Sequence, residues 1–257
     1  MFLWLKRRRR RQLLATPYPE SWRAIVENNI AHFQLLSDQD QTRLLERLRI
    51  LVHEKHWEGC EGLAITDEMK VTIAGMASLM LLGMQGDYCF DGISSILIYA
   101  RTFRRPGRRS SGILVDEEDE LMGEAWHGGS IVLSWSNVLE SGQNIGNGSN
   151  LVIHEFAHHL DGLDGEMGGT PPLPTRHAER NWYAVTQREY ERLWQDAKSG
   201  KKTLIDPYGT TNRAEFFATS SECFFERPVE MRKRHTELYR LLSRFYQLDP
   251  AAWYFRD

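Results

Sequence analysis

The stretch that decides the fold of this 257-residue chain is Leu-Val-Ile-His-Glu-Phe-Ala-His at residues 151–158. His154 and His158 are four residues apart, so on a helix their imidazoles project from one face about one turn apart. Two imidazole nitrogens at that separation can occupy two corners of a zinc tetrahedron. Glu155 would lean toward the open corner, where a carboxylate can take a proton from zinc-bound water and pass it to a leaving amine. The stretch therefore predicts a helix that carries a hydrolytic zinc site, and a plain pair of core or surface histidines is the competing interpretation.

Two histidines need a third protein ligand, and the residues alone leave three candidates open: Glu215, Glu222 and His127. Glu215 and Glu222 are seven residues apart, which places them on one face of a helix about 10 Å apart along its axis. Only one of them can therefore reach the metal. Glu215 also has a structural interpretation, because Asn212 three residues earlier would form a capping box with it.

Other polar side chains near the motif have two interpretations each. Tyr208, in a Pro-Tyr-Gly turn seven residues before Glu215, can offer its hydroxyl to a developing oxyanion or simply pack in the turn. Asp161 lies three residues after His158 on the same face, where it can orient an imidazole or end the helix as a surface acid. His159 points about 100° away from His158, and we do not expect it to bind the metal.

Hydrophobic periodicity predicts helices, then strands, then helices again. We expect helices over residues 22–33, 37–52 and 66–82, strands over 93–99, 113–115 and 130–135, and helices from 150 onward. The helix at 66–82 is apolar all round, which is typical of a buried central helix. This order predicts an α+β fold with a small sheet and a helical C-terminal part that carries the third zinc ligand. We expect the last strand to bind an extended peptide as an added strand through Ile131, Val132, Leu133, Ser134 and Trp135.

The composition favours one core in a single domain over residues 16–257, since 41% of the residues are hydrophobic and 11% aromatic. Six of the 32 basic residues lie in Lys6–Arg11, so the rest of the chain has 26 basic against 35 acidic residues, a net charge of −9. Such a body argues against direct nucleic-acid binding. We expect residues 1–15 to be a solvated basic tail; the alternative is weak contact with an anionic membrane surface.

Cysteine usage and hydropathy point to a protein of the cytoplasm. Cys60, Cys89 and Cys223 are widely separated and in no metal or redox spacing, which suits a reducing compartment. No apolar run approaches the ~20 residues that span a bilayer, so the sequence excludes an integral membrane protein.

Stretches spread over nearly the whole chain add a family resemblance. They lie at residues 61–63, 66–74, 96–99, 123–126, 131–135, 154–161 and 214–225. In this combination and order they resemble the MtfA (Mlc titration factor A) family of bacterial zinc peptidases. The resemblance implies a zincin-like catalytic core similar to that of anthrax lethal factor, with one Zn²⁺ held by His154, His158 and Glu215 and with Glu155 as general base. It leaves Glu222 to support the ligands, and the spacing of Tyr208 to Glu215 is similar to that of the catalytic tyrosine and glutamate ligand in lethal factor.

The function implied by the resemblance is hydrolysis of a peptide or protein substrate, with a preference like that of an aminopeptidase. The free amine would then need an acidic partner, and the sequence offers Glu118, Glu120 and Glu124 without choosing among them. Some family members place an additional histidine near the metal from the segment before the substrate strand, whereas residues 113–119 of this chain contain none.

A different class of function is also implied by the family name. It is that of a regulatory protein that binds and sequesters a transcriptional repressor, with a structural or regulatory zinc site. An amidase acting on a non-peptide substrate is a third possibility.

Overall fold

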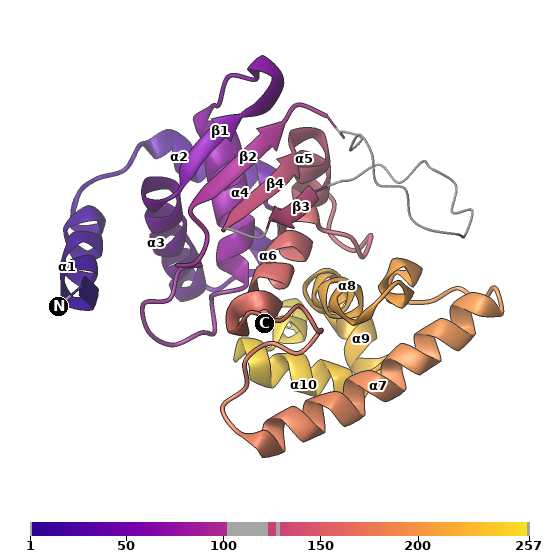
Figure 1. Ribbon diagram of the computed structural model, residues 1–257. Helices are drawn as coiled ribbons and strands as arrows, with labels where there is room; N and C mark the ends of the chain where they lie inside the picture. The colour runs from indigo at the N-terminus through magenta and orange to yellow at the C-terminus, as the bar shows by residue number, and fades with distance from the viewer. Residues whose placement is uncertain (1, 102–122, 127–128, 256–257) are drawn as a thin grey trace.

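The sheet of the protein is small and lies among helices. The computed structural model describes residues 2–101, 123–126 and 129–255 (Figure 1). The strands are β1 (His56–Gly59), β2 (Ser95–Tyr99), β3 (Gly123–Trp126) and β4 (Ser130–Ser134). Their order in the sheet is β1-β2-β4-β3, with β1, β2 and β4 parallel and β3 antiparallel to β4. The predicted α+β arrangement is confirmed, whereas the predicted strand at 113–115 lies outside the described residues.

Strand β4 lies inside the sheet and is not available to a peptide. Ile131 pairs with Ile96 of β2 on one side and with Ala125 of β3 on the other. The prediction that residues 130–135 form the substrate-edge strand is therefore wrong, and Trp135 begins helix α5 instead. The physical reason is visible in its burial: Ile131, Val132, Leu133 and Ser134 are all buried, as expected for a strand covered on both faces. Within the described residues, β1 and β3 form the two edges of the sheet.

The helices before the sheet follow the sequence pattern closely. They are α1 (Phe2–Ala15), α2 (Glu20–Asn29), α3 (Asp38–Glu54) and α4 (Asp67–Leu79), with the short helix η1 (Ala31–Leu35) after α2 and η2 (Cys60–Gly62) after β1. Ser37 begins α3 by accepting a hydrogen bond from the Asp40 N–H (3.2 Å), and Thr66 begins α4 by accepting one from Met69 (3.3 Å). Helix α4 is buried along most of its length and contacts α2, α3, α5 and α6, so it is the central helix that its composition predicted.

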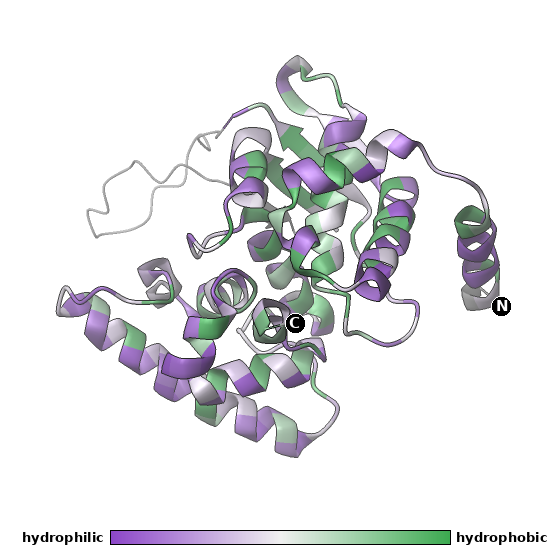
Figure 2. Cartoon of the chain, turned by 180° about the vertical axis from the view of Figure 1, so that it is seen from behind, coloured by the Kyte–Doolittle hydropathy of each residue, from purple (hydrophilic) through white to green (hydrophobic). Residues whose placement is uncertain are grey.

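Most of the helices after the sheet lie below it in Figure 1, whereas α5 lies beside the strands. The helices after the sheet are α5 (Trp135–Gln143), α6 (Leu151–Asp161), η3 (Gly162–Asp164), α7 (Arg176–Lys198), η4 (Pro207–Thr210), α8 (Arg213–Glu226), α9 (Pro228–Arg234), α10 (Thr236–Tyr246) and η5 (Pro250–Phe255). Aromatic rings of α8 fill the space between them: Phe217 lies 5.6 Å from Trp182 of α7, and Phe224 stacks on Tyr246 of α10 at 5.5 Å, centroid to centroid. Hydrophobic residues gather in the strands and inner helices, whereas α1 and α7 carry mainly hydrophilic ones (Figure 2).

The basic segment at the start of the chain differs from the solvated tail that we expected. Residues 2–15 form α1, and Arg10 in it is buried, with its guanidinium bonded to Glu54 (2.6 and 2.7 Å) and Asp91 (2.7 Å). Arg49 of α3 donates to backbone carbonyls at the end of α1, including that of Leu13 (2.7 Å). Repulsion among neighbouring arginines would favour a solvated segment. Glu54 and Asp91, both distant in the sequence, instead hold Arg10 against the body. The extent of the single domain, residues 16–257, stays a prediction. No helix among the described residues is both long and apolar enough to cross a membrane.

Helix α5 passes so close to the end of α2 that only glycine fits at the contact. A Cβ atom at Gly142 would lie 2.2 Å from the carbonyl oxygen of Asn29 and 2.2 Å from Cε of Met76. We expect Gly142→Ala to lower the free energy of unfolding by about 1–3 kcal/mol, because the backbone oxygen cannot move aside as a side chain would. Urea denaturation measures this. Gly168→Ala, where a Cβ meets no atom within 4 Å, should leave the midpoint nearly unchanged.

Candidate metal centre

Helix α6 presents the two histidines of the motif on one face. It begins at Asn150, whose side-chain oxygen accepts a hydrogen bond from the N–H of Ile153 (3.1 Å). Its apolar residues are buried against α8, α4 and the strands β3 and β4. The rings of His154 and His158 lie 4.8 Å apart, centroid to centroid, and Glu155 between them in sequence is 3% exposed.

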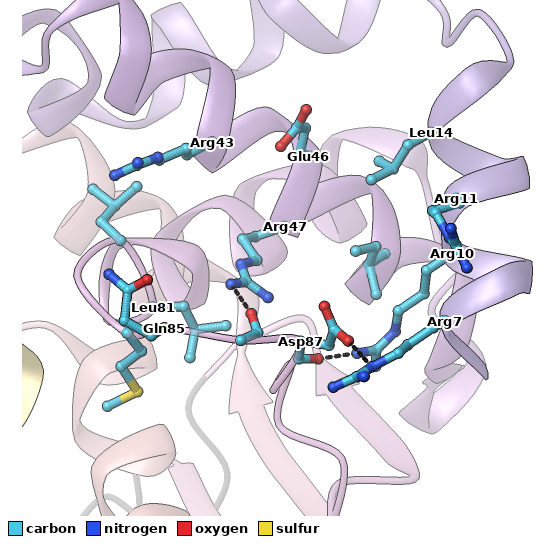
Figure 3. A pocket seen from close by; sticks show the side chains of 14 residues that line it. Arg7, Arg10, Arg11, Leu14, Arg43, Glu46, Arg47, Leu81, Gln85 and Asp87 are labelled. Carbon is cyan, nitrogen blue, oxygen red and sulfur yellow. Dashed lines mark hydrogen bonds and ion pairs between the residues drawn. The ribbon is translucent and has the colours of Figure 1, made fainter. Parts of the chain in front are cut away.

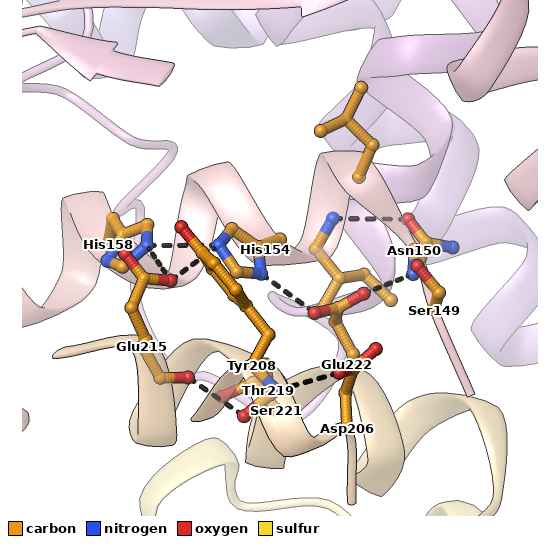
Figure 4. Close-up of polar contacts among 12 residues, drawn as sticks. Ser149, Asn150, His154, His158, Asp206, Tyr208, Glu215, Thr219, Ser221 and Glu222 are labelled. Carbon is orange, nitrogen blue, oxygen red and sulfur yellow. Dashed lines mark hydrogen bonds and ion pairs between the residues drawn. The ribbon is translucent and has the colours of Figure 1, made fainter. Parts of the chain in front are cut away.

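Helix α8 brings Glu215 to the same place. Asn212 caps this helix by accepting the N–H of Glu215 (2.9 Å), which is the Asn212 half of the predicted capping box. The Glu215 carboxylate lies against the two histidines, with Oε2 3.1 Å from Nε2 of His154 and 3.3 Å from Nε2 of His158 (Figure 4). The capping and metal-facing interpretations of this segment are therefore compatible.

The three facing atoms have the spacing of three corners of a zinc tetrahedron. The two Nε2 atoms are 3.1 Å apart, which completes a triangle with sides of 3.1, 3.1 and 3.3 Å. Zinc bonds of about 2.0–2.1 Å at tetrahedral angles place neighbouring ligand atoms about 3.3–3.4 Å apart. Two imidazole nitrogens and one carboxylate oxygen are also the donors that zinc prefers in catalytic sites. His154, His158 and Glu215 thus fit a metal ion, and the described part of the chain holds this one cluster of metal-binding side chains.

Glu222 holds the other side of His154. Its Oε1 atom lies 2.7 Å from Nδ1 of His154, and its Oε2 atom accepts the backbone N–H of Asn150 (2.5 Å). An Nδ1–H that donates to this carboxylate leaves the lone pair of Nε2 free to face the cluster. Burial alone would lower the pKa of His154, but the carboxylates of Glu222 and Glu215 raise it well above its ordinary value. Burial would likewise raise the pKa of Glu215, yet its hydrogen bonds to His154 and His158 lower it to about 2.

Tyr208 lies in η4 beside the side chains of His154, His158 and Glu215, which we call the metal-facing cluster. Its ring centroid is 6.3 Å from that of His154, the residue is 48% exposed, and its side chain rises between the two histidines in Figure 4. The Asp206 carboxylate fixes the turn by accepting the backbone N–H of Tyr208 (2.8 Å). The structure therefore places the ring of Tyr208 near that of His154, and its role as an oxyanion donor stays a prediction.

Comparison with known proteins gives the family. A model of the glucose-regulated metallo-peptidase M90 family matches residues 4–247 of the chain. Mlc titration factor A of Serratia proteamaculans is 33% identical over 223 residues, which cover 84% of this chain and 83% of the relative. Mlc titration factor A of Pectobacterium atrosepticum is 32% identical over 242 residues, covering 91% and 88%. The chain belongs to the MtfA family of metallopeptidases. The uncharacterized protein slr2042 of Synechocystis sp. is 34% identical over 245 residues, covering 94% of this chain and 89% of the relative.

Membership of the MtfA family confirms the resemblance noted in the sequence and implies a metallopeptidase with a bound metal ion. The metal-facing cluster is the group of side chains in the described residues that suits such an ion. The identity of the metal and the roles of the individual residues remain proposals.

Asp161 and His159 occupy different surroundings in this MtfA protein. Asp161 is fully buried, its Oδ2 atom accepts the backbone N–H of Gly169 (2.8 Å), and burial raises its pKa to about 6. Among the described contacts it makes no hydrogen bond to a histidine, so its orienting role stays a prediction. His159 lies away from the cluster against Phe90 (6.1 Å between centroids), as its position on the helix predicted. Burial lowers the pKa of His159 to about 4.

Most of the remaining candidate site residues lie outside the described part of the chain. His127, Glu118, Glu120 and the segment 113–119 are outside the described residues. Glu124 lies in β3, the edge strand that contacts α6.

Glu226 is a buried residue of this site that sequence reasoning missed. It accepts hydrogen bonds from the Asn150 side-chain amide (2.9 Å) and the N–H of Gly146 (3.2 Å), so it supports the cap of α6 from behind. Its spacing of four residues from Glu222 places both acids on one face of α8 and would have indicated their joint position. Burial raises the pKa of Glu226 to about 7.

This raised pKa predicts a pH-dependent stability. Between its usual pKa of 4.5 and about 7, the unfolded chain loses a proton from Glu226 that the folded chain keeps. The free energy of unfolding should therefore fall as the pH rises through this window, by up to about 3 kcal/mol, and level off above it. We expect Glu226→Gln to reduce the decline in urea denaturation between about pH 4.5 and 7 with a chelator present, leaving the share that comes from Asp161, whose pKa burial raises to about 6. The exposed Glu230→Gln serves as the control, and an unchanged decline in Glu226→Gln would contradict the assignment.

Proposed function

We propose that this MtfA family member is a zinc-dependent peptidase with a zincin-like catalytic core. The observation that carries the proposal is the triangle of ligand atoms from His154, His158 and Glu215, next to a buried Glu155. A zinc ion held there would supply a Lewis acid and lower the pKa of a bound water to about 7. The open corner of the tetrahedron would leave room for that water.

The residues of this chain would each have one task in the reaction. Glu155 would accept the proton of the attacking water and deliver it to the leaving amine. Tyr208 would donate a hydrogen bond from its hydroxyl to the oxyanion of the tetrahedral intermediate. Glu222 would keep the ring of His154 in one tautomer and orientation through its 2.7 Å contact with Nδ1.

We propose the outer edge of β3, rather than β4, as the binding place of an extended peptide. Among the described residues, strand β3 has a paired strand on one side, β4, and it contacts α6, the helix that carries the motif. An exposed strand edge offers N–H and C=O groups that a peptide backbone can pair with. In an aminopeptidase the free amine would need an acid near this edge, and Glu124 lies in the strand itself.

Removing the Tyr208 hydroxyl tests its proposed role. We expect Tyr208→Phe to lower kcat by about 10–100-fold with little change in KM, less than the loss typical of an enclosed oxyanion donor, because Tyr208 is half exposed. Steady-state kinetics on a peptide substrate measures this, with Tyr183→Phe on α7, which is also exposed, as the control. An unchanged kcat in Tyr208→Phe would show that the tyrosine only packs in its turn.

The peptidase proposal is tested by metal analysis and hydrolysis together. We expect one zinc per freshly purified chain and cleavage within a broad peptide library. Acetylation of the peptide N-termini should abolish the cleavage if the enzyme is an aminopeptidase, and should leave it intact if the enzyme is an endopeptidase. Protein with stoichiometric zinc that cleaves no peptide would refute the proposal.

A second function is favoured by the names of the relatives, Mlc titration factor A. Under it, the chain binds a transcriptional repressor and contacts no nucleic acid itself. Wild type and Glu155→Gln would then bind that partner equally, and neither would hydrolyse peptides. We propose the cytoplasm as the place of either function, since Cys60, Cys89 and Cys223 are all free.

A further inference from the structure

Helix α1 is held to the body by one face. Arg10 is buried between Glu54 and Asp91, and Lys6, one turn earlier, forms an ion pair with Asp91 (2.7 Å). Lys6 and Arg10 are four residues apart, so both side chains leave the helix on the same side. This fixes which side of α1 faces solvent.

The exposed surface of α1 is basic and ends in exposed apolar side chains. Arg7, Arg8, Arg9 and Arg11 are exposed, Arg7 forms an ion pair with Asp87 of the body, and the helix contains no acid. At its N-terminal end Trp4 is 56% and Leu5 39% exposed. The Arg8 guanidinium lies over the Trp4 ring, 5.6 Å from its centroid. We call Trp4, Leu5 and these four arginines the basic face of α1.

The basic face continues across a groove toward α3. A cavity of about 650 Å³ separates the two helices, and its lining includes Arg7 and Arg11 of α1 and Arg43 and Arg47 of α3 (Figure 3). Apolar side chains, among them Leu14, Ile50 and Leu81, also line the cavity. Glu46 and Asp87 are the acids that line this groove, and five arginines outnumber them. The positive charge therefore spans two helices.

We propose that the basic face of α1 docks on the surface of a bilayer that contains anionic phospholipid. Guanidinium groups bind lipid phosphates, and an indole ring with a neighbouring leucine is suited to the boundary between headgroups and acyl chains. Each arginine near such a surface strengthens binding about fivefold. Several arginines with one tryptophan and one leucine are enough for reversible attachment of a folded domain.

The charge distribution favours a membrane surface over a nucleic acid. The chain outside Lys6–Arg11 has a net charge of −9, so a long polyanion that wrapped the body would be repelled, whereas a flat surface meets the basic face alone. An exposed Leu5 beside Trp4 also has no use against phosphates and riboses. In Figure 1, α1 lies at one edge of the molecule, away from α6 and α8. Docking through α1 would therefore leave the candidate metal centre open to solvent.

Vesicle flotation of the full chain tests the docking. The probes are vesicles of phosphatidylcholine alone and vesicles with about 30% phosphatidylglycerol, at low and high salt. We expect binding to the anionic vesicles only, weakened at high salt, and weaker binding to a duplex oligonucleotide of equal charge concentration. Equal binding to both kinds of vesicle, no binding at low salt, or a preference for the oligonucleotide would overturn the proposal.

Matched variants locate the contact. Replacing Arg8, Arg9 and Arg11 by glutamine should weaken vesicle binding about 100-fold, whereas the same change at the exposed Arg176, Arg180 and Arg240 should have little effect. Trp4→Ala should weaken binding, and Trp194→Ala should not. Trp194 is a close control, because it is 47% exposed on α7 with Lys198 over its ring at 4.7 Å. If the two triple variants, or the two tryptophan variants, bind alike, the basic face of α1 is not the docking surface.

Discussion

Replacing Glu155 by glutamine is expected to lower kcat for peptide hydrolysis by about 10³-fold or more while leaving the zinc in place. Glu155 follows His154 on α6 and is 3% exposed, so its carboxylate is shielded from bulk water next to the metal-facing cluster. Glutamine has nearly the same size and can fill the same space. It cannot accept a proton, however, and proton acceptance from water is the task proposed for Glu155. The loss should therefore appear in kcat rather than in zinc content or folding.

Zinc content and the rate of peptide hydrolysis need to be measured on the same preparation. Zinc content by elemental analysis should stay at one per chain in Glu155→Gln, and the single-turnover rate on a cleavable peptide should fall. Glu166→Gln, an exposed position shortly after the same helix, should keep full activity. If zinc-loaded Glu155→Gln retained a tenth or more of the wild-type rate, another group would have to be the base.

The sequence predicted those parts of the site that depend on local geometry. Four residues of helix are enough to place His154 and His158 on one face, and the cap at Asn212 acts within a single turn. It could not tell that β4 is an internal strand, because the flanking strand β3 has four residues and pairing partners are set by the whole sheet. The burial of Arg10 likewise depends on acids 44 and 81 residues away.

The seven-residue spacing of Glu215 and Glu222 predicted part of their arrangement but not all of it. Seven residues on a helix correctly indicated that the two acids point the same way; that only one of them binds a metal stays a prediction. What spacing could not show is that both contact His154. Glu215 lies against Nε2 (3.1 Å) and Glu222 against Nδ1 (2.7 Å), so the imidazole ring lies between two acids that are two turns apart on α8. In the proposed metal site the two acids would therefore have complementary tasks, one binding the metal and one fixing the ring.

This division of tasks predicts different results for the same kind of change at the two positions. We expect Glu215→Ala to reduce zinc affinity well beyond the about 10–100-fold typical for loss of an outer partner, because a site with two neutral imidazoles loses its only anionic ligand. Glu222→Gln should stay within that range, since an amide can still hold the ring of His154. Titration against a chromophoric zinc chelator measures both affinities, and His154→Ala gives the limit for loss of a ligand.

Added zinc separates the two roles further. Excess zinc should restore most of the peptidase activity of Glu222→Gln, because all three ligand atoms remain, and should not restore that of Glu215→Ala. The outcome that contradicts this assignment is the reverse order: a Glu222→Gln variant that holds zinc more weakly than Glu215→Ala would make Glu222 the ligand. The 3.1 and 3.3 Å distances from Glu215 to the two Nε2 atoms would then describe a mere ion pair, and the triangle would not be the metal site.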